Sequence, residues 1–327
     1  MIEINKKNAR MWSIMGINPS IWSIGFNEVV SNKDNVALLT ADLARYSGLM
    51  RTFNAHPNMC YNIGIAEQNM VSVAAGMAMS GVQPFMTTYA PFMTMRCADQ
   101  VRHLMGDLNL NMKAIGSAAG LSGGFSGPGL QVVSDIALMR SIPNMVVLSP
   151  ADCVEAIKMI VAMADLDAPV YMRFCGSVNL PMVYTEDYDL QIGKVIELQQ
   201  GSKVALLATG TELVYEALKA SKKILEQTGQ QVTVANVHTI KPIDKDYLRS
   251  LTNEHSLIVS IEEHNVIGGM GSAIAEALSE FKNDTRMMYI GIQDKIYTMG
   301  RRPFLLEQAG LTADSIAETV IKEIEII

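Results

Sequence analysis

Charged side chains are scarce in this sequence. Only 18 % of its 327 residues are Asp, Glu, Lys or Arg, whereas 49 % are hydrophobic. This balance suits buried parallel sheets and large subunit interfaces better than a small, highly solvated monomer. The net charge of −7 and the lack of any Lys/Arg cluster argue against nucleic-acid binding. The length is sufficient for two α/β domains, each with its own core.

Cysteine and histidine are both few and poorly spaced for metal binding. The four cysteines lie far apart and form no CxxC pair, which fits neither a zinc site nor a disulfide framework. We therefore expect reduced, mostly buried thiols in a cytoplasmic protein. The five histidines show no metal-ligand spacing, and no nucleophile triad emerges. Catalysis by side chains alone is poorly supported, which points to a bound cofactor.

Hydrophobic runs that could target or anchor the chain are also lacking. The first residues, MIEINKKNARMW, contain neither the apolar core nor the cleavage site of a secretory signal. The uncharged run 69–95 is long enough to span a bilayer, but Gln83, Pro84 and Pro91 help to break it into helix, turn and strand. We therefore expect no membrane span.

Apolar strands and helices alternate along most of the chain. The first 35 residues are expected to be irregular, with Trp12, Trp22 and Phe26 as anchors. Strands are predicted near residues 36–40, 83–88, 111–117, 145–148 and 169–173, with helices at 62–81, 91–105, 133–141 and 151–165. The helix at 91–105 has a polar face that includes Arg96 and Arg102.

A second series of strands and helices follows a linker at residues 179–189. Its strands are predicted at 204–209, 231–236, 257–261 and 287–290, and an amphipathic helix at 313–327. The alternation predicts two doubly wound α/β domains with mostly parallel sheets, at residues 1–182 and 190–327.

Two glycine-rich turns are candidate anion sites. The loop 120–129, GLSGGFSGPG, has neither the lysine of a P-loop nor a GxGxxG pattern, so it better suits a flexible loop that faces the substrate. The second, GGMG at 268–271, leaves two interpretations open. It is either an anion site at a helix N-terminus or a tight strand-to-helix turn.

One carboxylate stands out in the predicted helix 62–81, NIGIAEQNMVSVAAGMAMSG, where Glu67 is the only ionisable residue. A carboxylate set against so much apolar surface must be paired, protonated or used in chemistry. The structural alternative is a core helix whose Glu lies at the exposed N-terminal end and complements the helix dipole.

Glu67 lies in a set of motifs that extends over much of the chain. They are TADL at 40–43, the run 62–92 that begins NIGIAEQNM, RSIPN at 140–144 and PAD at 150–152. Together they resemble the pyrimidine-binding domain of transketolases, and IEEHNVIGGMGSAIAEAL at 261–278 resembles the transketolase C-terminal domain. The resemblance covers nearly the whole chain beyond about residue 30. Because the sequence lacks the GDG…N motif of the diphosphate-binding domain, it resembles the second subunit of a split transketolase.

The resemblance implies a thiamine-diphosphate-dependent enzyme that is active only with a diphosphate-binding A-type subunit. The two chains would form an α2β2 heterotetramer in which the partner holds Mg²⁺ (or Ca²⁺). The reaction would transfer a two-carbon ketol unit from a ketose donor to an aldehyde acceptor.

Five residues match functional positions of this family. Glu67 would contact a ring nitrogen of the aminopyrimidine and share a proton with it. Tyr89 and Phe92 would sandwich that ring, with ordinary core packing as the alternative. Asp42 matches an acid near the thiazolium ring, or else caps a helix. Arg173 matches an Arg that binds the substrate phosphate, or else forms an ion pair.

Departures from the family pattern bear on the substrate. Ala118, Ser126 and Leu130 stand where transketolases that use sugar phosphates normally carry His, Asp and His. Met95 falls where a third aromatic often occurs, and the segment 18–25 lacks an expected Arg. A site without these hydroxyl-binding groups discriminates less for polyhydroxylated substrates. Two alternatives therefore stay open: an acyloin-forming or 2-oxo-acid dehydrogenase β-type subunit with a 2-oxo-acid donor, and a degenerate subunit that only scaffolds or regulates.

Overall fold

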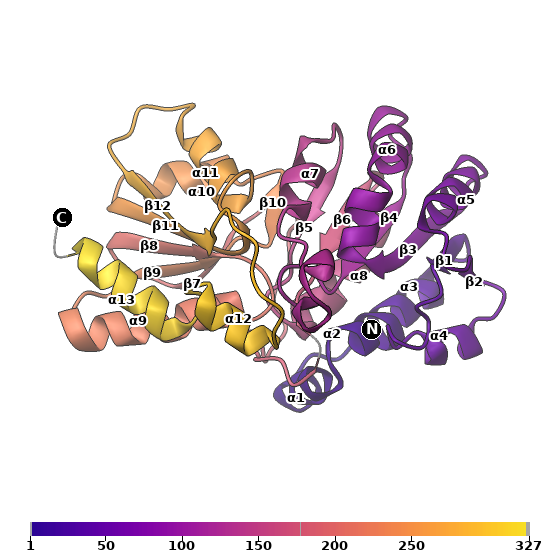
Figure 1. Ribbon diagram of the computed structural model, residues 1–327, viewed down its shortest axis with the longest axis horizontal. Coiled ribbons are helices and arrows are strands. Elements are labelled where there is room, and N and C mark those ends of the chain that lie inside the picture. Colours follow the sequence, from indigo (N-terminus) through magenta and orange to yellow (C-terminus); the bar gives the residue numbers. More distant parts are fainter. Residues whose placement is uncertain (1, 177, 325–327) are drawn as a thin grey trace.

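Two sheets lie side by side in this protein, and helices cover both faces of each (Figure 1). The computed structural model describes residues 2–176 and 178–324. Within these ranges all strand pairs but two are parallel. The predicted fold class, two α/β units with mostly parallel sheets, is therefore confirmed. No helix of the described ranges is long and apolar enough to cross a membrane.

The first sheet contains seven strands in the order β10-β5-β6-β4-β3-β1-β2. They are β1 (Val36–Thr40), β2 (Cys60–Asn62), β3 (Gln83–Tyr89), β4 (Lys113–Ser117), β5 (Val146–Leu148), β6 (Val170–Arg173) and β10 (Thr239–Lys241). All five residues of β1 are buried, which explains its run of apolar side chains. Strand β10 comes from the second half of the chain and runs antiparallel along β5. Strand β10 lies in the predicted second domain but belongs to the sheet of the first. The sheets therefore do not decide the predicted domain limits at residues 182 and 190, which stay a prediction.

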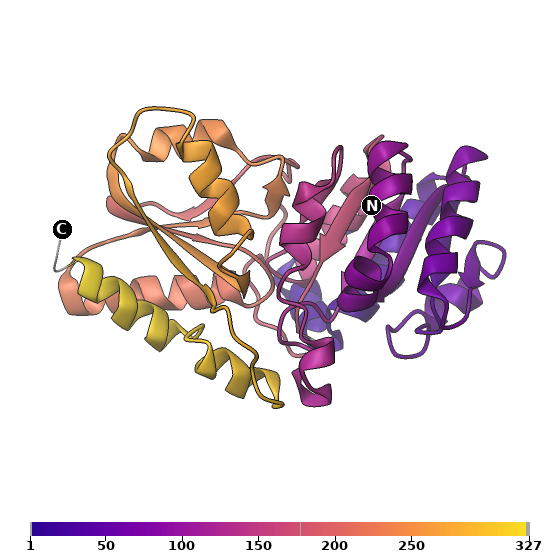
Figure 2. The ribbon, with the colours of Figure 1, turned by 45° about the horizontal axis from the view of Figure 1, so that its top comes forward.

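Helices cover both faces of the first sheet (Figures 1 and 2). On one face lie α5 (Glu67–Met79), the consecutive turns η2 (Phe92–Arg96), α6 (Ala98–Gln100) and η3 (Val101–Asp107), and α7 (Asp135–Ser141). On the other lie α8 (Cys153–Asp165) and the N-terminal helices. The connections contain α4 (Met50–Ala55), η4 (Gly124–Ser126) and η5 (Pro128–Leu130). Helix α5 begins at Glu67 rather than at residue 62, because Asn62 belongs to β2.

The first 35 residues are largely helical, so the prediction of an irregular segment is wrong. They form α1 (Lys6–Met15), α2 (Ile17–Ser20), the π-helical η1 (Ile21–Phe26) and α3 (Asn27–Asn32) before β1 begins. The expected anchors Trp12, Trp22 and Phe26 are all buried. Phe26 packs edge to face against Trp22 at 6.0 Å between ring centroids, and against Phe85 of β3 at 5.3 Å. Such tertiary contacts stabilise helices that are too short to form on their own.

The second sheet has five strands in the order β12-β11-β8-β9-β7. They are β7 (Ile196–Gln199), β8 (Lys203–Ala208), β9 (Thr233–Asn236), β11 (His255–Asn265) and β12 (Arg286–Ile292), and only β7 is antiparallel to its neighbour. Helices α9 (Leu213–Thr228) and α13 (Ala313–Ile324) cover one face, and α10 (Lys245–Leu251) and α11 (Met270–Leu278) the other. The short helix α12 (Arg302–Gln308) precedes α13.

Buried carboxylates fasten the two halves to each other. Asp152 caps α8 and also accepts hydrogen bonds from the amides of Val183 and Tyr184 in the linker, each at 2.8 Å. Glu155 accepts from Nδ2 of Asn236 in β9 at 2.9 Å. Burial raises the pKa of Asp152 to about 6 and that of Glu155 to about 7. The joint between the halves therefore contains groups that titrate near neutral pH.

The stability of the chain should fall as the pH rises from about 6.5 to 7. Because burial raises the folded-state pKa of Glu155 to about 7, the folded chain holds a proton that the unfolded chain has already released. Glu262 and Glu263, whose pKa burial also raises to about 7, act in the same direction. Burial lowers the pKa of His238 and His264 to about 4, which has the opposite effect on stability, but chiefly below the ordinary histidine pKa of about 6.5. Burial also lowers the pKa of Lys113 to about 7, and this lysine opposes the fall above that pH. Thermal unfolding at a series of pH values measures the fall.

Glu155→Gln should reduce this pH dependence, whereas Glu186→Gln, which changes an exposed linker carboxylate, should leave it as in the wild type. An unchanged slope in Glu155→Gln would show that the joint does not titrate in this range.

Candidate active site

The predicted functional residues lie together at the carboxyl edge of the first sheet. This edge is formed by the carboxyl-terminal ends of β1, β2 and β3. Thr40 at the end of β1 pairs with Asn62 of β2 and with β3 in a parallel register. The segments that follow parallel strands meet at one edge of the sheet. Asp42 follows β1, Glu67 opens the helix after β2, and Tyr89 ends β3.

Glu67 is almost completely buried at the N-terminus of α5. Its side chain is only 4 % exposed, and the position complements the helix dipole. Its Oε2 atom accepts a hydrogen bond from Nη1 of Arg96 at 2.8 Å. Burial, with the Glu67 charge adding to it, raises the pKa of the Cys97 thiol to about 12. Cys97 therefore stays protonated and is unsuited to nucleophilic attack.

Two aromatic rings lie beside this ion pair. Tyr89 and Phe92 have ring centroids 6.1 Å apart and planes tilted by 47°. The guanidinium carbon of Arg96 lies 4.0 Å from the Phe92 ring centroid. Arg96 therefore touches both groups, stacking on the ring of Phe92 while it donates to Glu67. Burial and the nearby Tyr46 hydroxyl raise the pKa of Tyr89, so its hydroxyl is neutral at physiological pH.

Asp42 is held in place by Asn62. The Asp42 amide donates to Oδ1 of Asn62 at 3.0 Å, and Nδ2 of Asn62 donates to Oδ1 of Asp42 at 2.9 Å. Asp42 has a φ of 58°, a left-handed conformation that Asp adopts more readily than most residues. The helix α4 that follows has Leu49 at its N-cap, so the alternative of Asp42 as the cap of that helix is wrong. Its carboxylate stays at the exposed edge near β2.

The loop expected to face the substrate is fastened to the second sheet. Glu263 of β11 accepts a hydrogen bond from the Leu121 amide at 2.7 Å and pairs with Arg302. Gly120 has a φ of 63°, and a Cβ at this position would lie 2.5 Å from Oε1 of Glu263. Glycine is therefore needed here so that the carboxylate can approach the backbone. Ser126 lies farther along the loop and is exposed.

The second glycine-rich turn is filled by a side chain of the protein itself. Glu262 accepts hydrogen bonds from the amides of Met270 and Gly271 at 2.7 and 2.8 Å, at the start of α11. A Cβ at Gly269 would lie 2.2 Å from Oε2 of Glu262. The interpretation of GGMG as an anion site is therefore wrong, and the tight strand-to-helix turn is confirmed.

Comparison with known proteins identifies both halves of the chain. Residues 22–177 match the family described as "Transketolase, pyrimidine binding domain", and residues 193–316 match "Transketolase, C-terminal domain". The chain belongs to the transketolase family.

Relatives within this family include proteins that are named as subunits. A 6-deoxy-6-sulfo-D-fructose transketolase subunit of Clostridium sp. is 34 % identical over 289 residues, which cover 88 % of this chain and 88 % of that protein. An apulose-4-phosphate transketolase subunit of Actinobacillus succinogenes is 32 % identical over 297 residues, which cover 90 % and 94 %. A solved structure described as "Split gene transketolase, inactive beta4 tetramer" has a TM-score of 0.84 at 32 % identity and covers 94 % of this chain and 97 % of that one.

Membership of the transketolase family implies dependence on thiamine diphosphate. The residues at the strand edge fit the pyrimidine part of this cofactor. The Arg96 guanidinium, a flat group with N–H donors, already stacks on Phe92 and bonds to Glu67. An aminopyrimidine ring offers the same two contacts. Among the described residues no cluster of three or more His, Cys, Asp or Glu could hold a metal ion.

Arg173 lies in the interior of this transketolase-family chain, away from solvent. Its side chain is 1 % exposed, with Nε donating to Oδ2 of Asp135 at 2.7 Å and Nη2 donating to the carbonyl of Glu263 at 3.1 Å. Tyr171 donates to the same Asp135 oxygen at 2.8 Å. These contacts correct the prediction of a substrate-phosphate ligand in favour of its alternative, the ion pair. The guanidinium joins β6, α7 and β11 and is shielded from solvent.

Arg96 and Asn62 are site residues that the sequence does not single out. The sequence pattern puts Arg96 on the polar face of a regular helix, but η2 is a π-helical turn, a feature often found at functional sites. This turn accommodates an arginine that is directed at Glu67. Asn62 opens the family motif in the sequence, yet its bond to Asp42 depends on the register between β1 and β2.

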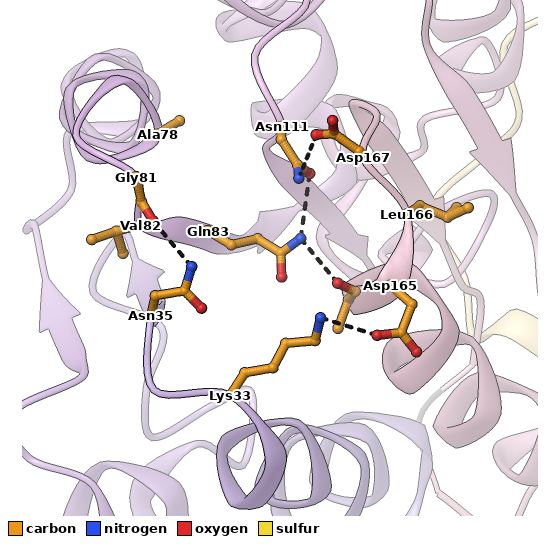
Figure 3. Close-up of a pocket in the computed structure, with 11 residues that line it drawn as sticks. Lys33, Asn35, Ala78, Gly81, Val82, Gln83, Asn111, Asp165, Leu166 and Asp167 are labelled. Carbon is orange, nitrogen blue, oxygen red and sulfur yellow. Dashed lines mark hydrogen bonds and ion pairs between the residues drawn. The ribbon is translucent and has the colours of Figure 1, made fainter.

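A cavity of about 400 Å³ lies at the amino-terminal ends of β1 and β3, opposite the ends that carry the candidate site (Figure 3). Several of its polar side chains form hydrogen bonds or ion pairs. Lys33 bonds to Asp165 at 3.0 Å, Asn111 donates to Asp167 at 3.0 Å, and Gln83 donates to the carbonyl of Ala164 at 3.2 Å. The cavity therefore does not coincide with the edge that holds Glu67.

Arg173→Met should lower the free energy of unfolding by about 3–5 kcal/mol, because it leaves Asp135 buried without its cation. Urea unfolding of the isolated chain measures this loss, and the double variant Arg173→Met/Asp135→Asn should recover part of it. Arg102→Met removes an exposed arginine and should change stability by less than about 0.5 kcal/mol. Normal stability of Arg173→Met together with a raised substrate KM would restore the phosphate-ligand role.

Proposed function

We propose that this chain is the pyrimidine-binding (B-type) subunit of a thiamine-diphosphate-dependent transketolase. It would transfer a two-carbon ketol unit from a ketose donor to an aldehyde acceptor. The observation that carries the proposal is the placement of Glu67 beside Tyr89 and Phe92 at the carboxyl edge of the first sheet. A buried carboxylate next to two partly accessible rings provides one proton partner and one stacking surface.

The side chains at this edge would contact different parts of the cofactor. Phe92 and Tyr89 would hold the pyrimidine ring, and Glu67 would hold a proton at a nitrogen of that ring. Asp42, fixed by Asn62, would place a second carboxylate on the thiazolium side. When bound, thiamine diphosphate supplies the nucleophilic carbon that the protein side chains lack.

A partner subunit is part of the proposal. Three large apolar side chains near the site are exposed: Tyr46 by 79 %, Ile65 by 78 % and Met95 by 46 %. Such side chains gathered around a functional edge are typical of a surface that another chain covers. The partner would hold the diphosphate through Mg²⁺ (or Ca²⁺). An α2β2 heterotetramer satisfies these requirements.

The donor is left open by the side chains around the loop. Ala118 and Leu130 are half-buried and carry no hydrogen-bonding group, and Ser126 is exposed. The two named relatives act on a sulfonated and a phosphorylated sugar, respectively, as their names state. A ketose donor is the proposal for this chain, and a 2-oxo acid is the alternative.

Glu67→Gln should strongly reduce turnover in the reconstituted complex and leave folding intact. Kinetics should show kcat lower by about 10²–10⁴-fold, the range for loss of a proton-transfer group. The ion pair with Arg96 is half-exposed on the arginine side, so its loss should cost little stability in thermal unfolding. Glu226→Gln, on an exposed face of α9, is the matched control and should keep full activity. Near-normal turnover by Glu67→Gln would refute the proton role.

The chain alone should show no ketol transfer, and activity should appear on mixing with a diphosphate-binding subunit, thiamine diphosphate and Mg²⁺. A coupled assay with ketose phosphates, unphosphorylated ketoses and 2-oxo acids as donors then separates the two reactions. Turnover of a ketose supports the proposal, whereas turnover of 2-oxo acids alone would replace it by the acyloin or dehydrogenase alternative. Ketol transfer by the isolated chain would refute the two-subunit arrangement.

A further inference from the structure

Arg96 makes two contacts at once in the candidate active site. Its guanidinium donates to Oε2 of Glu67 at 2.8 Å, and its central carbon lies 4.0 Å from the centroid of the Phe92 ring. The first contact uses the carboxylate that should receive the pyrimidine nitrogen, and the second covers the ring on which the pyrimidine should stack. The guanidinium thus uses one oxygen of the carboxylate and the aromatic ring that the pyrimidine requires.

A guanidinium and an aminopyrimidine have much in common as ligands. Both are flat, both present N–H groups in their plane, and both stack on an aromatic face. A carboxylate accepts hydrogen bonds from either one. One pair of protein groups, Glu67 and Phe92, therefore suits both ligands, and the two cannot use it in the same way at the same time.

The rest of the Arg96 environment allows its side chain to leave while its backbone stays. Gln68 of α5 donates from Nε2 to the Arg96 carbonyl at 3.1 Å, which fixes the main chain beside Glu67. The side chain is 45 % exposed and so has a route to solvent.

We propose that Arg96 is a built-in substitute for the pyrimidine ring, which takes the ring's contacts in the chain without cofactor and is displaced when the cofactor binds. This inference rests on the proposed function and adds a competition within its site. The arginine keeps the buried Glu67 paired and the Phe92 ring covered before assembly. Each cofactor that binds must therefore break one half-exposed ion pair and one cation–π contact.

Arg96→Ala should tighten cofactor binding because nothing has to be displaced. The reconstituted complex is titrated with thiamine diphosphate and Mg²⁺ by calorimetry, and its Kd should be about three- to ten-fold lower than that of the wild type. Arg102→Ala removes the same charge from the same helical segment. Because Arg102 pairs with Asp99 and Asp107 rather than with Glu67, the Kd of this variant should equal the wild-type value. Arg96→Met, which keeps an apolar stem, replaces Arg96→Ala if that variant unfolds.

Inorganic pyrophosphate with Mg²⁺ is the matched ligand control, because it has no ring for Arg96 to imitate. Its Kd should be the same for the wild type and Arg96→Ala. Tighter binding of thiamine diphosphate but not of pyrophosphate supports the substitution. Equal or weaker binding of thiamine diphosphate, or equal tightening of both ligands, overturns it while the proposed function stands. A wild-type complex that does not bind thiamine diphosphate at all overturns the proposed function and this inference together.

Discussion

The parallel pairing of β1 with β2 and β3 is the constraint on which the candidate site depends. Thr40 lies opposite Asn62 and Thr87, so the three chain segments that follow leave the sheet at one edge. A shift of one residue would turn every side chain on these strands to the other face. Burial of β1 on both sides fixes this register, since all of its residues belong to the core. The position of Glu67 therefore depends on how β1 packs in the interior of the sheet.

Buried carboxylates perform a second structural task, both within each half of the chain and between the two sheets. Glu262 accepts hydrogen bonds from two backbone amides at the start of α11. Glu263 accepts one from the Leu121 amide and forms an ion pair with Arg302. Asp135 forms an ion pair with Arg173. A buried carboxylate is tolerated only where donors surround it. Both glycine-rich turns supply backbone amides to such carboxylates, which is why they resemble anion sites in the sequence yet bind groups of the same chain.

Short-range hydrophobic patterns in the sequence predict the positions of several strands and helices. Alternating apolar segments locate β1, β3 and α8 closely, and the isolation of Glu67 in an apolar segment marks the candidate site before any motif is considered. Long-range contacts account for the errors. The N-terminal helices depend on aromatic contacts with the sheet, and β10 reaches across from the other half of the chain. Arg173 matches a family position in the sequence, but only the fold shows that Asp135 and the Glu263 carbonyl surround it.

The ionic arrangement around Glu67 follows from its place at an edge that another chain is proposed to cover. A carboxylate that is 4 % exposed needs a partner both before and after assembly, because burial without one is costly. Interior residues such as Asp135 meet this need with permanent partners. Glu67 instead accepts a hydrogen bond from a long, half-exposed side chain that no closed network holds in place. A removable cation suits a carboxylate whose ligand arrives later. The difference between Arg173, which is enclosed on all sides, and Arg96, which reaches in from solvent, thus separates the arginine that holds the fold together from the one that can make way for a ligand.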